Sequence, residues 1–434
     1  MDLIFFCCKE GKERAMLQEI ITAIDIGSKK LSATIAMKSK NDELEILYTK
    51  SCKSQGVEKG AITNIDECRK SMENLLDELE DKTKLDIKEV TIGISSRDIR
   101  ISETTVKINL YEGKVTKEAL NEGIAKAKEE FGLSDQEVII DEIVNFYIIN
   151  SQVIYDNILN WKADSFEMNI TLVIGKKVQI EKYYEVFRGT KYSLSDIKSN
   201  IITGKQIFLS ENKYDGSTVL VDVGAGDVDI ALFDINSVAK FMSSVPVGGN
   251  NISNDLAICG NFSFQEADNL KKIYAGNYKT LYNDESVQDE IEVGTLEVSK
   301  ELFYEVVNAR IEEILNHINI ELKKTGHYDR ICSIILYGDA LSYFEDIVEI
   351  VSRIFKIKTQ VIKDIDLGIK NSENITSLAL VKEVYDRLIL LEDNKIIPNN
   401  KNAEKVDEDT ENLHNNEYEN NILNKLKNFF NKIF

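Results

Sequence analysis

Short apolar runs and helical repeats alternate along the first part of the chain, which is typical of an α/β fold. The apolar runs within Thr22–Ala36 and the alternating stretch Leu44–Lys53 predict three strands. Apolar residues at helical spacing from Ile65 to Leu79 then predict a helix, and Val90–Ile94 predicts a short buried strand. Together these elements make half of a doubly wound lobe.

The pattern changes at Ser96, where a second kind of unit begins. An alternating stretch, a helix that Thr116 can cap, and two more strands follow at Arg100–Leu110, Leu120–Phe131, Glu137–Ile149 and Ser165–Ile174. This order predicts a small inserted domain. We expect Lys182–Ser210 to return to the first lobe as helical segments.

The order of the first lobe recurs in the second half of the chain. The strand pair Val219–Phe233 precedes a third strand, two helices and a buried strand, at Val238–Val247, Phe264–Tyr274, Leu296–Lys323 and Ile331–Tyr337. Between them, Gly248-Gly249 predicts a tight turn, with a helix capped by Asn251 or Ser253 beginning near Ile252.

An aspartate and a glycine turn follow the first strand of each half. Ile24-Asp25-Ile26-Gly27 aligns with Val221-Asp222-Val223-Gly224, about 200 residues later. One such hairpin is weak as a signal, because any hairpin can contain glycine. Two copies predict duplicated halves that face each other across a cleft and clamp a polyphosphate with its metal. This is the arrangement of the actin-like ATPase fold.

The composition excludes several classes of function. A charge of 53 − 74 = −21 argues against nucleic acid as a partner. The six cysteines and three histidines have no metal-ligand spacing, and the scattered cysteines indicate a reducing cytosol. No apolar run approaches the ~20 residues of a spanning helix. Residues 1–19 form an N-terminal extension, and translation could start at Met1 or Met16.

The end of the chain combines an acidic linker with a basic amphipathic segment. Residues 389–420 are rich in acids and asparagine, which predicts a flexible tether. In the tail, Asn421–Phe434, apolar residues recur at helical spacing among lysines, with no acid, which predicts a helix lying on a membrane surface. Its membrane-binding residues are Ile422, Leu423, Lys425, Leu426, Lys427, Phe429, Phe430, Lys432, Ile433 and Phe434.

From about Ile21 to its last residue, the chain resembles FtsA, the actin-like bacterial division protein. The resemblance rests on IDIGSKK at 24–30, SQGVEKGAITNIDE at 54–67, VPVGGNNISNDLA at 245–257, and the domain inserted after Val90–Ile94. It implies a nucleotide site made by Asp25, Gly27, Ser28, Lys30, Asp222, Gly224, Gly226, Gly248, Gly249, Lys271, Arg310 and Gly338. Asp25 and Asp222 would hold Mg²⁺ through water.

Three departures from the family bear on this site. Asp227 replaces a hydroxyl that contacts a phosphate, and Asp339 replaces a glycine of the adenosine motif. Val144 and Asn145 replace the family's Gln-Glu, and apolar Val144 cannot orient a water, so no catalytic residue is assigned. We expect ATP with Mg²⁺ to bind weakly or not at all, and hydrolysis to be weak or absent.

The resemblance also implies a domain plan. Residues 20–97 and 178–198 form the first lobe, 98–177 the inserted domain, and 199–388 the second lobe, with a helical subdomain at 256–325. The linker and the tail follow.

By the same resemblance, the chain would tether FtsZ to the cytoplasmic face of the membrane at the septum. Its partners would be the FtsZ C-terminal peptide, docking at about Ala257–Lys323, further copies of itself in filaments, other divisome proteins and anionic lipid. The alternatives are a PilM-like adaptor of pilus assembly, which lacks an amphipathic tail, a degenerate nucleotide-binding protein, and a phosphotransferase such as a sugar kinase.

Overall fold

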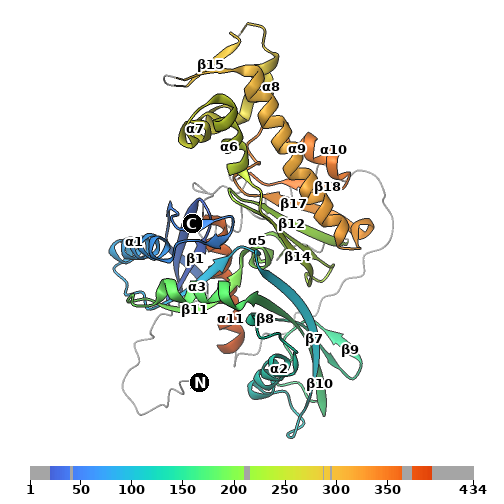
Figure 1. The fold of residues 1–434 in the computed structure, drawn as a ribbon. Helices are drawn as coiled ribbons and strands as arrows, with labels where there is room; N and C mark the ends of the chain where they lie inside the picture. Colours follow the sequence, from blue (N-terminus) through green and yellow to red (C-terminus); the bar gives the residue numbers. More distant parts are fainter. Residues whose placement is uncertain are drawn as a thin grey trace.

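Two lobes and a smaller domain make up the protein (Figure 1). The computed structural model describes residues 20–39, 43–209, 216–286, 288–293, 296–363 and 374–392. The extension before residue 20, the chain after residue 392 and therefore the amphipathic tail lie outside the described residues. Within those ranges, no helix is long and apolar enough to cross a membrane.

The first lobe is built on a sheet with the strand order β11-β6-β1-β2-β3. Its strands are β1 Ile20–Ile26, β2 Lys30–Lys38, β3 Leu44–Lys53, β6 Glu89–Ile94 and β11 Ser193–Ser199. The first three strands pair antiparallel, whereas β1, β6 and β11 run parallel. The predicted three-strand meander and buried strand are confirmed. The helical prediction for the return segment is wrong at β11, whose sequence SLSDIKS has too few apolar residues to indicate a strand.

Helices cover this sheet. In α1, Ile65–Thr83, the Asn64 side chain accepts hydrogen bonds from the amides of Asp66 and Glu67 and so caps the helix. The apolar face of α1 is buried against the sheet together with α3, Lys177–Phe187. The short pair β4 Val57–Glu58 and β5 Ala61–Ile62 precedes α1.

The inserted domain is a sheet with one helix on its face. Its strands have the order β7-β10-β8-β9, and its elements are β7 Ile99–Asn109, α2 Lys117–Glu130, β8 Glu137–Ile149, β9 Gln152–Ile154 and β10 Ser165–Lys176. The Thr116 hydroxyl accepts from the Ala119 amide at 3.2 Å, as predicted for the cap. Because β10 lies between β7 and β8, Phe166, Met168 and Ile170 form the centre of a separate core.

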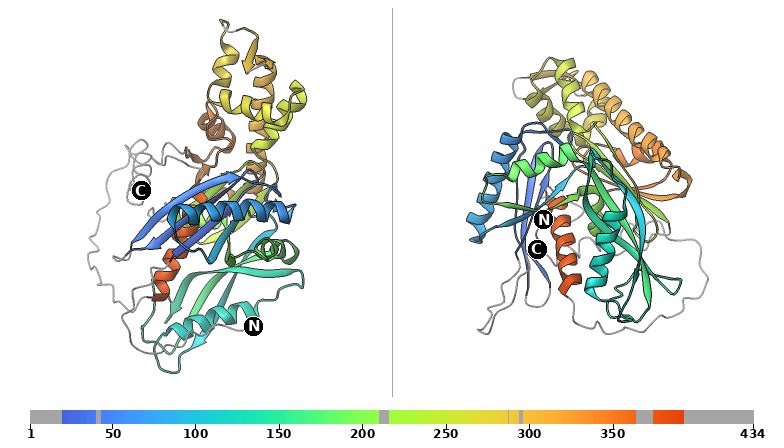
Figure 2. Two further views of the ribbon diagram at one scale, coloured as in Figure 1. Left: turned by 90° about the vertical axis from the view of Figure 1, so that its left-hand side faces the viewer. Right: turned by 60° about the horizontal axis from the view of Figure 1, so that its bottom comes forward.

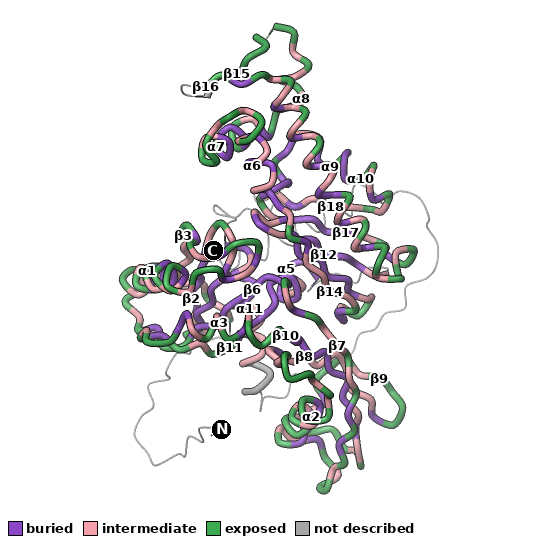
Figure 3. The backbone as a smooth tube through the Cα atoms, in the orientation of Figure 1, coloured by how far each residue is buried: buried purple, intermediate pink, exposed green. Residues whose placement is uncertain are grey.

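The second lobe repeats the first in its sheet. Its strands have the order β14-β13-β12-β17-β18, with β12 Ser217–Val223, β13 Val228–Phe233, β14 Ala239–Val245, β17 Ile331–Tyr337 and β18 Lys358–Val361. The helix α10, Ile347–Phe355, leads into β18. Figure 3 shows the central strands of both lobes as buried.

The helical subdomain stands above this second sheet. It contains α6 Gly249–Gly260, α7 Phe264–Tyr274, α8 Tyr278–Asn283, the hairpin β15 Glu290–Val293 and β16 Leu296–Ser299, and α9 Lys300–Lys324. The limits predicted for α7 are confirmed. The helix predicted over Leu296–Lys323 begins four residues late, because Leu296–Ser299 pairs with β15 instead. α6 begins at Gly249, before the predicted Ile252.

The last described helix crosses back to the first lobe. α11, Ile375–Glu392, packs on β1 and β2. It also contacts the short helices α4 Asn200–Thr203 and α5 Lys205–Phe208. Leu380, Val381 and Tyr385 meet Ile21 and Ala36 there. Figure 2 shows α11 running along the first sheet toward the inserted domain. The prediction that the second lobe extends to residue 388 is therefore wrong at its end, because α11 packs on the apolar face of the first sheet.

Candidate nucleotide cleft

The two glycine turns face each other between the lobes, as predicted. In the first, the Gly27 amide donates to the Lys30 carbonyl at 3.2 Å, and in the second the Gly224 amide donates to the Asp227 carbonyl at 2.9 Å. A Cβ atom added to Gly226 would lie 2.7 Å from the Ser28 hydroxyl oxygen. Only glycine therefore permits this approach of the two turns.

The start of α6 holds the second turn in place. The amides of Gly249 and Asn250 donate to the carbonyls of Gly224 and Ala225 at 3.1 and 2.8 Å, and the Asn251 side chain accepts from the Gly248 amide. A Cβ atom on Gly248 would lie 2.4 Å from the Gly224 carbonyl oxygen. Gly248 and Gly249 thus position the turn, and the Gly249 amide is already used by it.

Gly338 supports the same turn from β17. Its φ of +96° lies in a region that favours glycine, and a Cβ atom there would lie 2.5 Å from the Val223 carbonyl oxygen and 2.6 Å from an Asp222 carboxylate oxygen. Gly338 consequently lets the backbone pass directly beside Asp222.

Carboxylates gather in the cleft. Burial raises the pKa of Asp25 to about 6 and that of Asp229 to about 8, and it raises the pKa of Asp222 and Asp227 as well. Asp222 and Asp229 lie directly opposite each other on β12 and β13. No group of three or more His, Cys, Asp or Glu side chains in the described ranges is arranged to hold a metal. These carboxylates are therefore not arranged for three of them to coordinate one metal ion directly. Burial and the neighbouring aspartates disfavour the charged forms of these carboxyl groups.

Asp227 reaches across to the first lobe. The Ser95 hydroxyl, at the end of β6, hydrogen-bonds to the Asp227 carboxylate and, at 3.1 Å, to that of Asp229. The Ser96 amide donates to the other Asp229 oxygen at 3.0 Å. Sequence reasoning missed these bonds from Ser95 and Ser96 to Asp227 and Asp229, although the serine pair directly after a buried strand and Asp229 inside an apolar run were visible signals.

Lysines line the opposite side of the cleft. Lys271 donates to the Gly249 carbonyl and the Ser253 hydroxyl at 2.8 and 2.7 Å, and burial lowers the pKa of its ammonium to about 8. Asp268 forms ion pairs with Lys271, with Lys272 and, from the first glycine turn, with Lys29, at 2.9–3.0 Å. Burial raises the pKa of Asp268, but these three ammonium groups outweigh burial and hold it below its usual value.

Two further predicted residues have partners on the second lobe. Lys30 pairs with Asp339 at 3.0 Å, so the residue that replaces a family glycine joins the two lobes. Arg310, on α9, pairs with Asp255 of α6 and with Glu313. Arg310 therefore ties two helices of the helical subdomain together.

Val144 and Asn145 do not occupy the cleft, and the prediction that they do is wrong. Both lie on β8, where Val144 packs against the inserted domain's core and Asn145 donates to Asn169 at 2.7 Å. The strand that does enter the cleft is β11. It ends at Ser199, and the side-chain amide of the next residue, Asn200, donates to the Asp25 carboxylate at 2.7 Å. The structure thus removes the argument that Val144 prevents hydrolysis.

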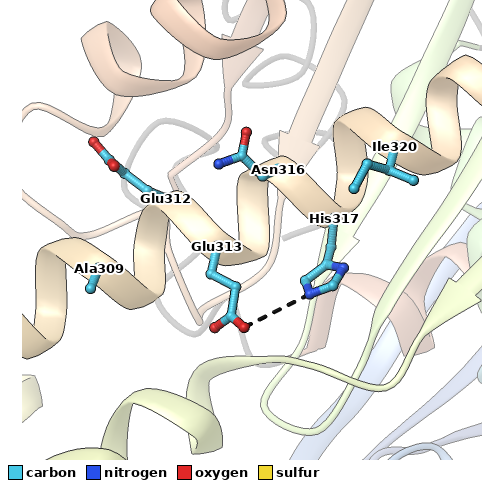
Figure 4. Close-up of a pocket in the computed structure, with 6 residues that line it drawn as sticks. All are labelled: Ala309, Glu312, Glu313, Asn316, His317 and Ile320. Atoms are coloured by element: carbon cyan, nitrogen blue, oxygen red, sulfur yellow. Dashed lines mark ion pairs between the residues drawn. The ribbon is translucent and has the colours of Figure 1, made fainter.

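A shallow pocket of about 390 Å³ lies elsewhere, on the outer face of α9. Figure 4 shows its lining residues Ala309, Glu312, Glu313, Asn316, His317 and Ile320. The dashed line joins Glu313 and His317, whose carboxylate oxygen and ring Nε2 are 3.9 Å apart. The pocket contains none of the predicted nucleotide residues, and it falls within the segment expected to bind a peptide.

Known proteins are similar in sequence to this chain over most of its length. A family model for the cell division protein FtsA matches residues 219–379. The FtsA of Neisseria meningitidis serogroup B is 25% identical over 348 residues, which cover 78% of this chain and 83% of that protein. The FtsA of Bacillus subtilis is 22% identical over 373 residues, covering 84% and 83%. The resemblance to FtsA is confirmed.

The FtsA-like chain also has a clear structural neighbour. The PilM-PilN complex of type IV pilus biogenesis aligns with a TM-score of 0.56 at 11% identity, covering 85% of this chain and 98% of the other. At this identity the likeness concerns the fold alone. The predicted actin-like fold, with two duplicated lobes, is confirmed.

Proposed function

We propose that this protein is an actin-like scaffold of bacterial cell division that tethers FtsZ filaments to the cytoplasmic membrane at the septum. The observation that carries the proposal is the sequence similarity to FtsA proteins over about 80% of the chain. A domain inserted between β6 and β11 and the acidic linker before a basic amphipathic tail support it. Peripheral attachment fits a described chain without a spanning helix.

The tail supplies the membrane contact. Its seven apolar side chains, partly buried in lipid at ~0.5–1 kcal/mol each, contribute roughly 3–7 kcal/mol. Each of its lysines near anionic lipid adds ~1 kcal/mol, and ordering the helix costs part of the sum. One tail therefore binds weakly and reversibly, and filaments that present many tails bind tightly through avidity.

The cleft binds ATP with Mg²⁺ weakly. Gly27, Ser28, Gly224 and Gly226 would approach the phosphates, Lys271 would lie beside the adenosine, and Asp25 and Asp222 would hold the hydrated cation. Bound Mg²⁺ would neutralise phosphate charge. The Asp227 carboxylate beside the turns opposes a polyphosphate, so affinity and hydrolysis are low. Lys29 and Lys30 already have carboxylate partners in Asp268 and Asp339, which compete with phosphate.

The helical subdomain receives the FtsZ C-terminal peptide. The shallow pocket on α9 supports this assignment, since it lies within Ala257–Lys323 and combines apolar Ile320 with polar Asn316 and His317. Self-association into filaments and contacts with other divisome proteins complete the proposed partners.

Phe430→Glu tests the tether. The change places a charge in the middle of the apolar face, so we expect a loss of ~2–4 kcal/mol per tail, a 30-fold to several-hundred-fold drop in partitioning. The measurement is co-sedimentation with anionic vesicles. Asn428→Glu, on the polar face, is the matched control and should cost the charge contribution alone. Equal partitioning of wild type and Phe430→Glu would refute the membrane tether.

An adaptor of type IV pilus assembly is the second candidate. The PilM-PilN complex shares the fold of this chain, so this candidate is tested beside the division scaffold. Localisation in cells separates the two functions. A band at the septum that is lost when residues 421–434 are deleted supports the division scaffold. Protein at the cell poles or spread through the cell, with a distribution that the deletion leaves unchanged, supports the adaptor.

A further inference from the structure

A group of charges with a buried centre joins three parts of the molecule. It consists of Lys198 on β11 of the first lobe, Asp141 and Glu142 on β8 and Lys128 on α2 of the inserted domain, and Arg387 on α11. We call it the Asp141 cluster. None of its members belongs to the nucleotide cleft or to the predicted tail.

Asp141 is the centre of the cluster. Its carboxylate pairs with the Lys198 ammonium, and the same oxygen accepts from the Arg387 guanidinium at 3.3 Å. The side chains of Lys198 and Asp141 are only 1% and 7% exposed. Arg387 also donates to Glu142 at 2.8 Å, and Lys128 approaches Glu142 at 2.6 Å. Ion pairs of alternating charge therefore connect the first lobe, the inserted domain and α11.

The inserted domain meets the second lobe through weaker polar contacts. Lys240 of β14 pairs with Glu103 of β7 at 2.8 Å, and both side chains are about one-third exposed, at 32% and 33%. The Asn236 amide donates to the hydroxyl of Tyr155, which is half exposed. Solvent screens such pairs, so they resist separation little.

Apolar packing also favours the first lobe. Ile99 and Val173 of the inserted domain belong to the first-lobe core. Of the domain's described residues, only Ile101 and Ile143 also pack against the core between the lobes.

The charges add to this difference. Separating Lys198 from Asp141 would leave a buried ion without its partner, whereas separating Lys240 from Glu103 leaves two hydrated ions.

We propose that the Asp141 cluster clamps the inserted domain to the first lobe and α11 as one body, and that its contact with the second lobe is the one that releases when the lobes move. Arg387 acts as a positioning residue in this clamp. Rearrangements of the nucleotide cleft would then move the inserted domain relative to β14 and leave its junction with β11 intact.

Hydrogen–deuterium exchange of the full chain tests the clamp. In Arg387→Met and Lys198→Met we expect amide exchange in β8 and β11 to accelerate by at least about fivefold, because local opening at the junction becomes easier. Lys240→Met is the matched control, a lysine-to-methionine change at a pair that is about one-third exposed, and should alter exchange in β8 and β11 by less than about twofold.

The outcomes are distinct. Unchanged exchange in β8 and β11 of folded Arg387→Met would overturn the proposal, as would a Lys240→Met variant that loosens the junction equally. If Lys198→Met does not fold, Arg387→Met still decides, because it keeps the Lys198–Asp141 pair. Circular dichroism confirms folding of each variant. None of these measurements depends on nucleotide, lipid or FtsZ, so the clamp can fail while the proposed function stands.

Discussion

The two glycine turns occupy equivalent places in duplicated lobes but have opposite electrostatic surroundings. The first turn contains Ser28, Lys29 and Lys30, and its aspartate, Asp25, accepts a hydrogen bond from Asn200. The second turn has no basic residue and brings Asp227 close to two further aspartates, Asp222 and the buried Asp229.

This contrast explains how the cleft is joined. Basic residues of the first turn pair with acids of the second lobe, Lys29 with Asp268 and Lys30 with Asp339, while Asp227 reaches back to Ser95. Residues at the proposed phosphate-binding positions therefore form bridges between the lobes. Duplication preserved the backbone of the hairpin, whereas the side chains diverged.

Removing Asp229, the buried acid on β13 beside the second turn, should have the largest effect on stability. The pKa of Asp229 is about 8 in the folded protein and 3.8 when unperturbed, so the unfolded state loses this proton first as pH rises. Stability is therefore lost between about pH 4 and 8. We expect Asp229→Asn to reduce this loss by roughly 3 kcal/mol between pH 5 and 9.

Urea unfolding of both proteins in EDTA-containing buffer at a series of pH values measures this difference. Asp86→Asn, at an exposed position, is the control and should leave the pH dependence unchanged. Parallel stability curves for wild type and Asp229→Asn would show that the second turn is not electrostatically strained.

Making the second turn more like the first should strengthen nucleotide binding. A negative charge ~5 Å from a phosphate costs ~3 kcal/mol at an effective dielectric constant of about 20. Because Arg97 lies near enough to offset part of this, we expect Asp227→Thr to tighten Mg-ATP binding by about 2 kcal/mol, roughly 30-fold.

Isothermal titration calorimetry measures the affinity, with Asp227→Asn as the variant that removes the charge but supplies no hydroxyl. That variant should recover most of the gain. Weaker binding by both would mean that the bridge from Asp227 to Ser95 matters more for the site than charge repulsion does.

Breaking a bridge of the basic turn should have the smallest effect. Lys30 and Asp339 are 30% and 45% exposed, so solvent screens the pair. We expect Lys30→Met to change the free energy of unfolding by no more than about 0.5 kcal/mol. Thermal unfolding by circular dichroism measures it, and a loss several times larger would show that this bridge holds the lobes together.

The duplicated fold and the place of the inserted domain could be predicted from local sequence patterns. Periodicity within each element and the repeated Asp-x-Gly turn are local signals, and both depend on residues that are neighbours in the chain. The limits of α7 and the Thr116 cap were predictable for the same reason. The tail at 421–434 remains a prediction from sequence.

Which side chains contact each other could be learned only from the three-dimensional fold. β11 is too polar to be recognised as a strand until β6 pairs with it. α11 belongs to the first lobe because it buries the apolar face of β1 and β2. Ser95 meets Asp227 across 132 positions, and Arg387 meets Asp141 across 246. Such pairs have no periodic signal in one sequence, because the packing of separate elements, rather than local chain geometry, brings them together.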